Sequence, residues 1–231
     1  MKAIGLARVN WVLLTLLVLA GVLATIRHYA PLPPAQLVIE QNIPPGPDWY
    51  LVQMPLYSQH AVMTFLHVVP AFLFVLLASI QLMPSIRRRY PVIHRWNGRL
   101  FVLLGISIGL SGLAMAVIMP FGGMLESIGT VFIAGAFLFS LFMGVYHIRG
   151  KNIAAHRAWM TRMLAIGFSP ITMRFFFTGF LYLSDIPARD VFALCMLFGV
   201  IVNLAAVEWW MKRGATRPVD REQLNMVINS Q

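Results

Sequence analysis

Cysteine and acidic side chains are scarce in this sequence. Its 231 residues include one cysteine and eight aspartates and glutamates, against eighteen lysines and arginines. The lone Cys195 excludes a disulfide within the chain, so the compartment cannot be read from cysteine usage. Charged residues make up only 11% of the chain, with a net charge of +10. Such a low charged fraction is not typical of a soluble domain.

Several catalytic signatures are also missing. The sequence contains no phosphate loop, no metalloprotease motif and no recognisable pairing of a nucleophile with a base. A hydrolytic enzyme is therefore disfavoured, and whether the protein is an enzyme of another kind stays open. The positive charge does not indicate nucleic-acid binding, because the sequence has no soluble basic domain that could carry it.

Long apolar runs are what the sequence has in abundance. Hydrophobic residues make up 59% of it, and the mean hydropathy is +0.75. Six runs approach the length that crosses a hydrocarbon core of about 30 Å: Val9–Ile26, His60–Met83, Gly98–Met119, Glu126–Tyr146, Met163–Leu183 and Val191–Met211. Backbone groups inside a bilayer must be hydrogen-bonded within their own segment, so these runs are helices. The sequence predicts an all-α, polytopic membrane bundle of six transmembrane helices, with the first helix peripheral.

The chain divides into three parts by composition. Residues 1–59 hold the first helix and an outer loop with half of the fourteen prolines, residues 60–213 form a five-helix membrane domain, and residues 214–231 are a cytoplasmic tail. The basic start of the first helix also fits a signal peptide, and its cleavage stays open. Its apolar run of about eighteen residues favours retention.

The basic residues predict the orientation. A cytoplasmic N-terminus puts fifteen of the eighteen lysines and arginines on the inner side. The positive-inside rule then predicts that both termini are cytoplasmic. An inner face of this charge also predicts contact with anionic lipid, whereas protein partners stay unknown.

Two similar blocks of sequence stand before apolar runs. The blocks are His94–Arg99 and His156–Arg162, which read HRWNGR and HRAWMTR. Each begins with His-Arg, carries a tryptophan within the next three positions and reaches another arginine five or six residues after the histidine. The repetition predicts two matched helix hairpins, each with a basic cytoplasmic turn.

These blocks also carry a resemblance. Residues Tyr90–Leu100 and His156–Arg162, together with His67 and Arg174, resemble a bacterial predicted-membrane-protein family, domain of unknown function 2306, over about residues 60–211. A weaker similarity, in histidine-bearing helix pairs, extends to transmembrane b-type cytochromes and to membrane factors of haem-oxidase maturation. The family resemblance implies a multi-pass protein of the bacterial cytoplasmic membrane and leaves its activity open.

The inner face gathers candidate ligands. The histidines expected at inner helix ends are His94, His147 and His156, and the arginines expected at the N-termini of the third and fifth helices are Arg95, Arg99, Arg157 and Arg162. Arginine at a helix N-terminus opposes the helix dipole unless an anion is bound there. Lipid phosphate, haem propionates and a phosphorylated or carboxylated substrate all fit. No histidine spacing typical of a metal site is present, so we expect no metal.

Two ionisable residues fall inside the expected membrane. His67 and Arg174 lie about 10 and 13 Å below the outer surface, estimated from helix rise, and His60 shares the helix face of His67. Intramembrane charges are expected to face the bundle interior and mark function. One interpretation is a structural polar network; the other is a cavity for haem b, a quinone or another small ligand.

These observations predict an integral membrane protein that binds a redox cofactor, haem b or quinone, or assists in its handling. The candidate cofactor-binding residues are His67, Arg174, His60, His94, His147 and His156. A dihaem arrangement is disfavoured, because only His67 is clearly intramembrane. One haem on the inner histidines, or on His67, remains compatible. The alternative is a small-molecule transporter or a lipid-binding scaffold without a redox cofactor.

Overall fold

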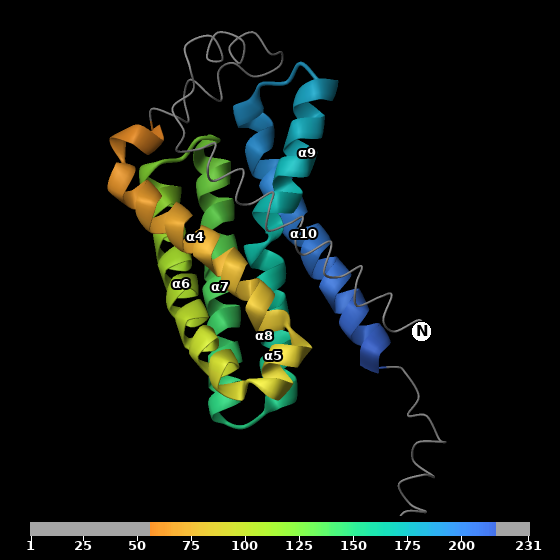
Figure 1. Ribbon diagram of the computed structural model, residues 1–231. Helices are drawn as coiled ribbons and strands as arrows, with labels where there is room; N and C mark the ends of the chain where they lie inside the picture. Colours follow the sequence, from red (N-terminus) through yellow and green to blue (C-terminus); the bar gives the residue numbers. More distant parts are fainter. Residues whose placement is uncertain (1–55, 216–231) are drawn as a thin grey trace, which may run out of the picture.

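The structure, a computed structural model, describes residues 56–215, and this part of the chain is helical throughout, with no strand (Figure 1). Its elements are α4 (Ala61–Leu82), α5 (Pro84–Arg89), α6 (Pro91–Ile118), α7 (Gly123–Arg149), α8 (Ile153–Gly167), α9 (Ser169–Leu183) and α10 (Ala188–Ala215). The expected first helix and most of both the proline-rich loop and the tail lie outside the described residues.

The multi-pass helical fold is confirmed. Five segments are long and apolar enough to cross a membrane: α4, α6, α7, α10 and the combined α8–α9 segment. At 28 residues, α6 is about 42 Å long by helix rise. Of the six expected transmembrane helices, the five that fall within residues 56–215 are present.

Two of the expected helix bounds were wrong. The third helix was expected from Gly98 but starts at Pro91, and the fifth was expected from Met163 but starts at Ile153. Pro91 occupies the first turn of α6, where a missing N–H costs nothing, and the Asn152 side chain accepts a hydrogen bond from the Ala155 N–H at 3.0 Å. Both His-Arg blocks are therefore helical, and not connections before helices.

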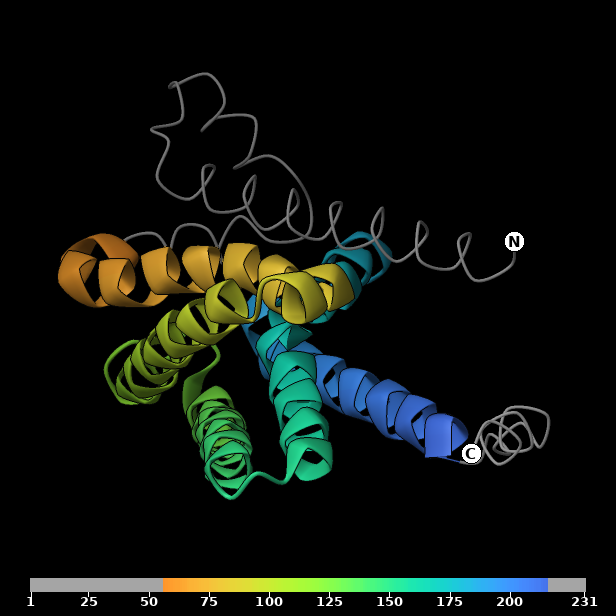
Figure 2. The same cartoon turned by 60° about the horizontal axis from the view of Figure 1, so that its bottom comes forward.

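The helices follow one another around an arc. Figure 2 shows α4, α6, α7, α8 and α10 in that order, and each packs against the next. α9 packs chiefly against α10, which also contacts α7 and α8. The two expected hairpins correspond to α4 with α6 and to α7 with α8.

The main core lies between the first four long helices of this arc. Phe74 of α4 stacks on Phe101 of α6 with ring centroids 4.0 Å apart, and Phe137 of α7 meets Phe74 edge-on at 5.9 Å. Leu141 and Met163 complete the buried cluster from α7 and α8. Phe101 and Met163 are the largest side chains that are fully buried. A smaller cluster, which includes Phe121 and Phe177, lies where α9 and α10 meet the α6–α7 connection.

The fifth expected helix is broken between α8 and α9. Pro170 has no N–H, so the carbonyl of Ile166 cannot accept its usual helical hydrogen bond. The Ser169 hydroxyl donates to that carbonyl instead, at 2.7 Å, and Ser169 is buried. The break is thus satisfied from within the protein, as backbone inside a membrane requires.

Helix α10 holds both sides of the break. The Asn203 amide donates to the carbonyl of Ala165 in α8 at 3.0 Å. Its oxygen accepts from the Thr172 hydroxyl in α9 at 2.8 Å. One side chain of α10 therefore bridges the two helices.

Close approach of α10 to α9 depends on Gly199. A Cβ at this position would lie 2.9 Å from the backbone nitrogen of Met173 and 3.0 Å from the carbonyl oxygen of Ser169. Backbone atoms cannot move aside as a flexible side chain can. The two helices could keep this distance only if residue 199 has no side chain.

We therefore expect Gly199→Ala to destabilise the fold by about 1–3 kcal/mol, the usual cost of overpacking. Gly135→Ala is the matched control, because a Cβ on this exposed glycine of α7 meets nothing within 4 Å. It should be neutral or slightly stabilising, since alanine favours helix over glycine. Thermal unfolding of both variants in detergent measures the difference. Equal stability of the two would contradict the close packing of α9 on α10.

Candidate functional site

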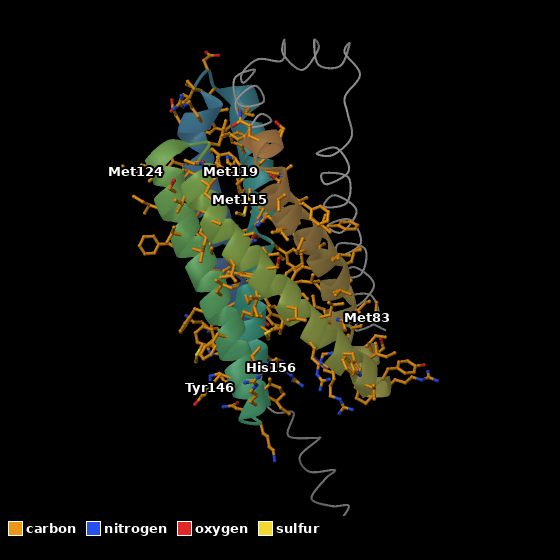
Figure 3. All side chains as sticks on the ribbon, turned by 90° about the vertical axis from the view of Figure 1, so that its left-hand side faces the viewer. Met83, Met115, Met119, Met124, Tyr146 and His156 are labelled. Carbon is orange, nitrogen blue, oxygen red and sulfur yellow. The ribbon has the colours of Figure 1, made fainter. Side chains whose placement is uncertain are left out.

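One end of the bundle is strongly basic. It is the end where α4, α7 and α10 finish and where α6 and α8 begin. Its basic residues are Arg87, Arg88, Arg89, Arg95, Arg99, Arg149, Lys151, Arg157, Arg162, Lys212 and Arg213. Figure 3 shows His156 and Tyr146 toward this end, which we call the basic end, and Met119 and Met124 at the opposite end.

The first His-Arg block joins α6 to α4. The Asn97 amide is buried and donates to the carbonyl of Leu77 at 3.1 Å and to the side-chain oxygen of Gln81 at 2.8 Å. A Cβ on Gly98 would lie 3.0 Å from the side-chain nitrogen of Gln81. Two residues of this block therefore serve helix packing, a role that the sequence reasoning missed.

The second block joins α8 to α10. The Arg162 guanidinium donates to both carboxylate oxygens of Glu208, at 2.5 and 3.2 Å, and lies 4.9 Å from the centre of the Trp159 ring. Of the four arginines expected to bind an anion, Arg162 already has a carboxylate partner inside the protein.

The other three arginines are exposed. Arg95, Arg99 and Arg157 form no ion pair within the part of the chain that the structure describes. Arg99 lies 4.6 Å from the centre of the Trp96 ring. The expectation that these arginines stand at helix N-termini was wrong, since α6 and α8 begin four or more residues earlier. The dipole effect falls off within the first turn, so it explains little here.

The two block histidines occupy equivalent places. His94 precedes Phe101 by seven residues, and His156 precedes Met163 by seven. Seven residues are about two helical turns, so each histidine lies on the same face of its helix as a fully buried core residue. Both imidazoles thus lie at the basic end of the main core, one on α6 and one on α8.

His156 has a fixed orientation. Its Nδ1 lies 2.7 Å from the carbonyl oxygen of Gly144. A carbonyl can only accept, so Nδ1 carries the proton and, in the neutral ring, Nε2 carries the free lone pair. Ligating histidines are commonly oriented in this way, by a hydrogen bond from the other ring nitrogen to a backbone carbonyl.

His94 has a buried ring nitrogen whose hydrogen-bonding capacity is unsatisfied in the part of the chain that the structure describes. Its Nδ1 is buried and has no hydrogen-bond partner among the described residues. Arg87 and His156 are both near enough to act on it electrostatically. Buried nitrogens without a hydrogen-bond partner are rare and costly, so this one indicates a functional role or a bound partner.

His147, the third expected inner histidine, lies elsewhere. It is on α7, where its ring contacts the ring of the adjacent Tyr146 at a centroid distance of 5.4 Å. No hydrogen bond joins it to His94 or His156 in the described part of the chain. Of the three inner histidines, His94 and His156 lie near enough for the charge of one to act on the other.

His67 belongs to a polar network between α4 and α6. Its Nδ1 lies 3.0 Å from the Ser111 hydroxyl, which itself donates to the carbonyl of Ser107 at 2.6 Å. The hydroxyl therefore accepts from His67. The ring also packs against Gly112, where a Cβ would lie 3.6 Å from the ring carbon Cε1. His60 precedes α4 and makes no capping hydrogen bond with its side chain.

Arg174 is exposed on α9 and was expected to be enclosed. No hydrogen bond or ion pair joins it to His67 within residues 56–215. Its charge acts instead on the phenol of Tyr57, just before α4, which is also influenced by the carboxylate of Glu126. Burial raises the pKa of Tyr57 to about 12; Arg174 opposes this rise and Glu126 adds to it.

Glu126 itself accepts a hydrogen bond from the Gly122 N–H and so caps the start of α7. Sequence reasoning missed Tyr57 as a residue on which the charges of both Arg174 and Glu126 act. The acidic residue in the first turn of α7 was the only signal, and it indicates a cap and not a site.

Two shallow apolar grooves lie on the surface of the bundle. One, of about 550 Å³, lies between α9 and α10 and is lined by Phe176, Phe180, Leu194, Cys195, Leu197, Phe198 and Ile201. The other, of about 590 Å³, lies along the first half of α6. Neither groove is lined by His67 or Arg174.

Comparison with known proteins gives one match. The family described as "Predicted membrane protein (DUF2306)" matches residues 64–211. No curated protein and no solved structure matches the chain. The weaker similarity to transmembrane b-type cytochromes is not supported by these comparisons.

The phenol of Tyr57 supplies a prediction for the opposite end. Its pKa in the fold, about 12, exceeds the ordinary value of 10.0, so the neutral phenol stabilises the fold below pH 10. That stabilisation is lost as the pH rises from 10 to 12, and the free energy of unfolding falls there by up to about 1.4 kcal/mol per pH unit. Tyr57→Phe should remove this part of the pH dependence in thermal unfolding. Arg174→Gln should extend it to higher pH, because the positive charge lowers the pKa.

Tyr146→Phe is the control for this titration. Tyr146 is exposed and lies toward the basic end, so its substitution should leave the loss of stability between pH 10 and 12 as it is in the wild type. Identical pH profiles for wild type and Tyr57→Phe would show that the phenol is not buried near Arg174.

Proposed function

The chain belongs to the predicted membrane protein family DUF2306. For this multi-pass membrane protein, we propose that it binds haem b between His94 and His156. The observation that supports this most is the buried Nδ1 of His94, which has no partner within the described residues. His156 stands near it and offers a free Nε2. A bound haem would supply one-electron chemistry.

The donor set fits such a group. Haem iron takes imidazole nitrogens as axial ligands, and the carbonyl of Gly144 holds His156 in the required tautomer. His94 comes from a different helix, so two ligands approach from separate elements. A quinone would need a hydrogen-bond donor at each carbonyl oxygen, and it makes less use of two imidazoles from separate helices.

The charges at this end fit the carboxylates of the group. Arg87 of α5 acts electrostatically on His94, Arg88 follows it in α5, and Arg95 follows His94 in α6. Arginine binds carboxylates through paired, charge-assisted hydrogen bonds. Glu208, the one acidic residue of the described basic end, is engaged by Arg162 and does not oppose an anion there.

The core supplies the apolar surroundings. Phe101 and Met163 follow the two histidines by two turns, and Phe74 stacks on Phe101. An apolar shell around a metal group excludes water and tunes its potential. His67 has no place in this site, because its Nδ1 is engaged by Ser111 on α6.

The experiment is an absorption spectrum of the full chain purified in detergent from haem-sufficient cells, oxidised and then reduced. We expect a Soret band and the split visible bands of a six-coordinate haem. His94→Ala and His156→Ala should each lose most of this absorbance, while His67→Ala and His147→Ala should keep it. Circular dichroism checks that every variant retains its helix content.

His156→Gln separates ligation from folding. A glutamine amide can still donate to the carbonyl of Gly144, so the helix contact is kept while the imidazole is lost. If His67→Ala loses the absorbance while the His94 and His156 variants keep it, the haem site is on α4 and not at the basic end. A colourless wild type that gains no Soret band from added haem would contradict the proposal. It would favour the transporter or lipid-scaffold alternative.

We further propose that the basic end faces the cytoplasm, in the bacterial cytoplasmic membrane with both termini inside, because basic loops are retained on that side. In a Cys195→Ala background, Lys151→Cys places a thiol at the basic end and Asp185→Cys places one at the opposite end. A membrane-impermeant thiol reagent applied to intact cells with a permeable outer envelope should label only the Asp185→Cys variant. Labelling of Lys151→Cys alone would reverse the orientation.

A further inference from the structure

The groove along the first half of α6 has no part in the proposed haem site. We define it by its lining residues: Val92, Ile93, Trp96, Asn97, Arg99, Leu100 and Leu103. Its volume is about 590 Å³, and its walls are apolar except for Asn97 and Arg99. Asn97 is occupied by Leu77 and Gln81 of α4, which leaves Arg99 as the group that faces a ligand.

The apolar part of the groove suits one acyl chain. Trp96 and Leu103 are 64% and 65% exposed, and they lie seven residues apart. That spacing is about 10 Å along the helix, or roughly two-thirds of a leaflet 15 Å thick. In an acyl chain lying in this groove, the part nearest the headgroup would contact the apolar residues that line it.

The polar part of the groove suits an anion. Arg99 is exposed and makes no ion pair within the described residues, whereas Arg162 of the second block is neutralised by Glu208. Side chains in a helix point back toward its N-terminus, so Arg99 extends toward the basic end, over Trp96 at 4.6 Å. A guanidinium that lies over an indole still has N–H groups that a phosphate can accept.

We infer that this groove binds one anionic phospholipid, with its phosphate on Arg99 and an acyl chain along Leu100 and Leu103. Charge complementarity selects this occupant. The described basic end holds eleven lysines and arginines and one acid, and that acid is already paired. A zwitterionic lipid could fill the apolar part equally well but would gain less from Arg99.

The test uses Trp96 as a probe that lies in the groove. The full chain is reconstituted in phosphatidylcholine that contains a small fraction of either phosphatidylglycerol or phosphatidylcholine with brominated acyl chains, which quench indole fluorescence on contact. The quenching lost in Trp96→Phe reports on the groove alone. We expect the brominated anionic lipid to be preferred about fivefold, the factor from roughly 1 kcal/mol per interfacial cation.

Arg99→Gln should reduce this preference to about one, since the apolar contacts remain. Arg149→Gln is the matched control, because it removes the same charge at the same end but away from the groove. It should keep the preference. The haem spectrum should not change in Arg99→Gln, so this site and the proposed haem site can fail independently.

Three outcomes would overturn the inference. Equal quenching by the two brominated lipids would show that the groove does not select charge. Loss of the preference in Arg149→Gln as well would show a general surface potential and no site. Relief of quenching by inorganic phosphate at constant ionic strength would show a site for a free anion and not for a lipid.

Discussion

The hydrocarbon core of a membrane offers no water, so each polar group in this bundle must find its partner in the protein. The helices meet this constraint with a few side chains that each join two elements. Asn97 ties α6 to α4, Ser111 receives His67, and Asn203 spans the break between α8 and α9. Against this background of satisfied groups, the buried nitrogen of His94 stands out.

The two His-Arg blocks are equivalent in two respects: the place of the histidine, and an arginine that lies over the tryptophan three residues before it. Their histidines hold matching places beneath Phe101 and Met163, on helices that do not follow each other in the arc. Their other residues differ in use: Asn97 packs against α4, and Arg162 pairs with Glu208 of α10. The repetition therefore preserves the imidazole and the contact between arginine and tryptophan, while the remaining contacts differ with the neighbouring helix.

The fold could be predicted from the sequence largely because long apolar runs determine it. Helix starts at Pro91 and Ile153 could not be predicted from hydropathy, since the added turns are polar and lie beyond the apolar runs. The break at Pro170 was visible as a proline, but its partners on α10 were not. The sites depend on helix phase and on neighbours distant in sequence. This is why Arg99 and Arg162 look alike in the sequence and both lie over a tryptophan, yet only Arg162 has a carboxylate partner among the described residues.

The bridge made by Asn203 also bears on how the molecule is assembled. α10 is the last of the described helices to be synthesised, yet it supplies the partner for the Ala165 carbonyl and packs its glycine backbone against Ser169 and Met173. Until α10 is in place, the Ala165 carbonyl lacks that partner and α9 lacks the helix it chiefly packs against. The packing of α8 and α9 is therefore completed by a helix that follows both in the chain, and their final arrangement depends on a segment that is synthesised after them.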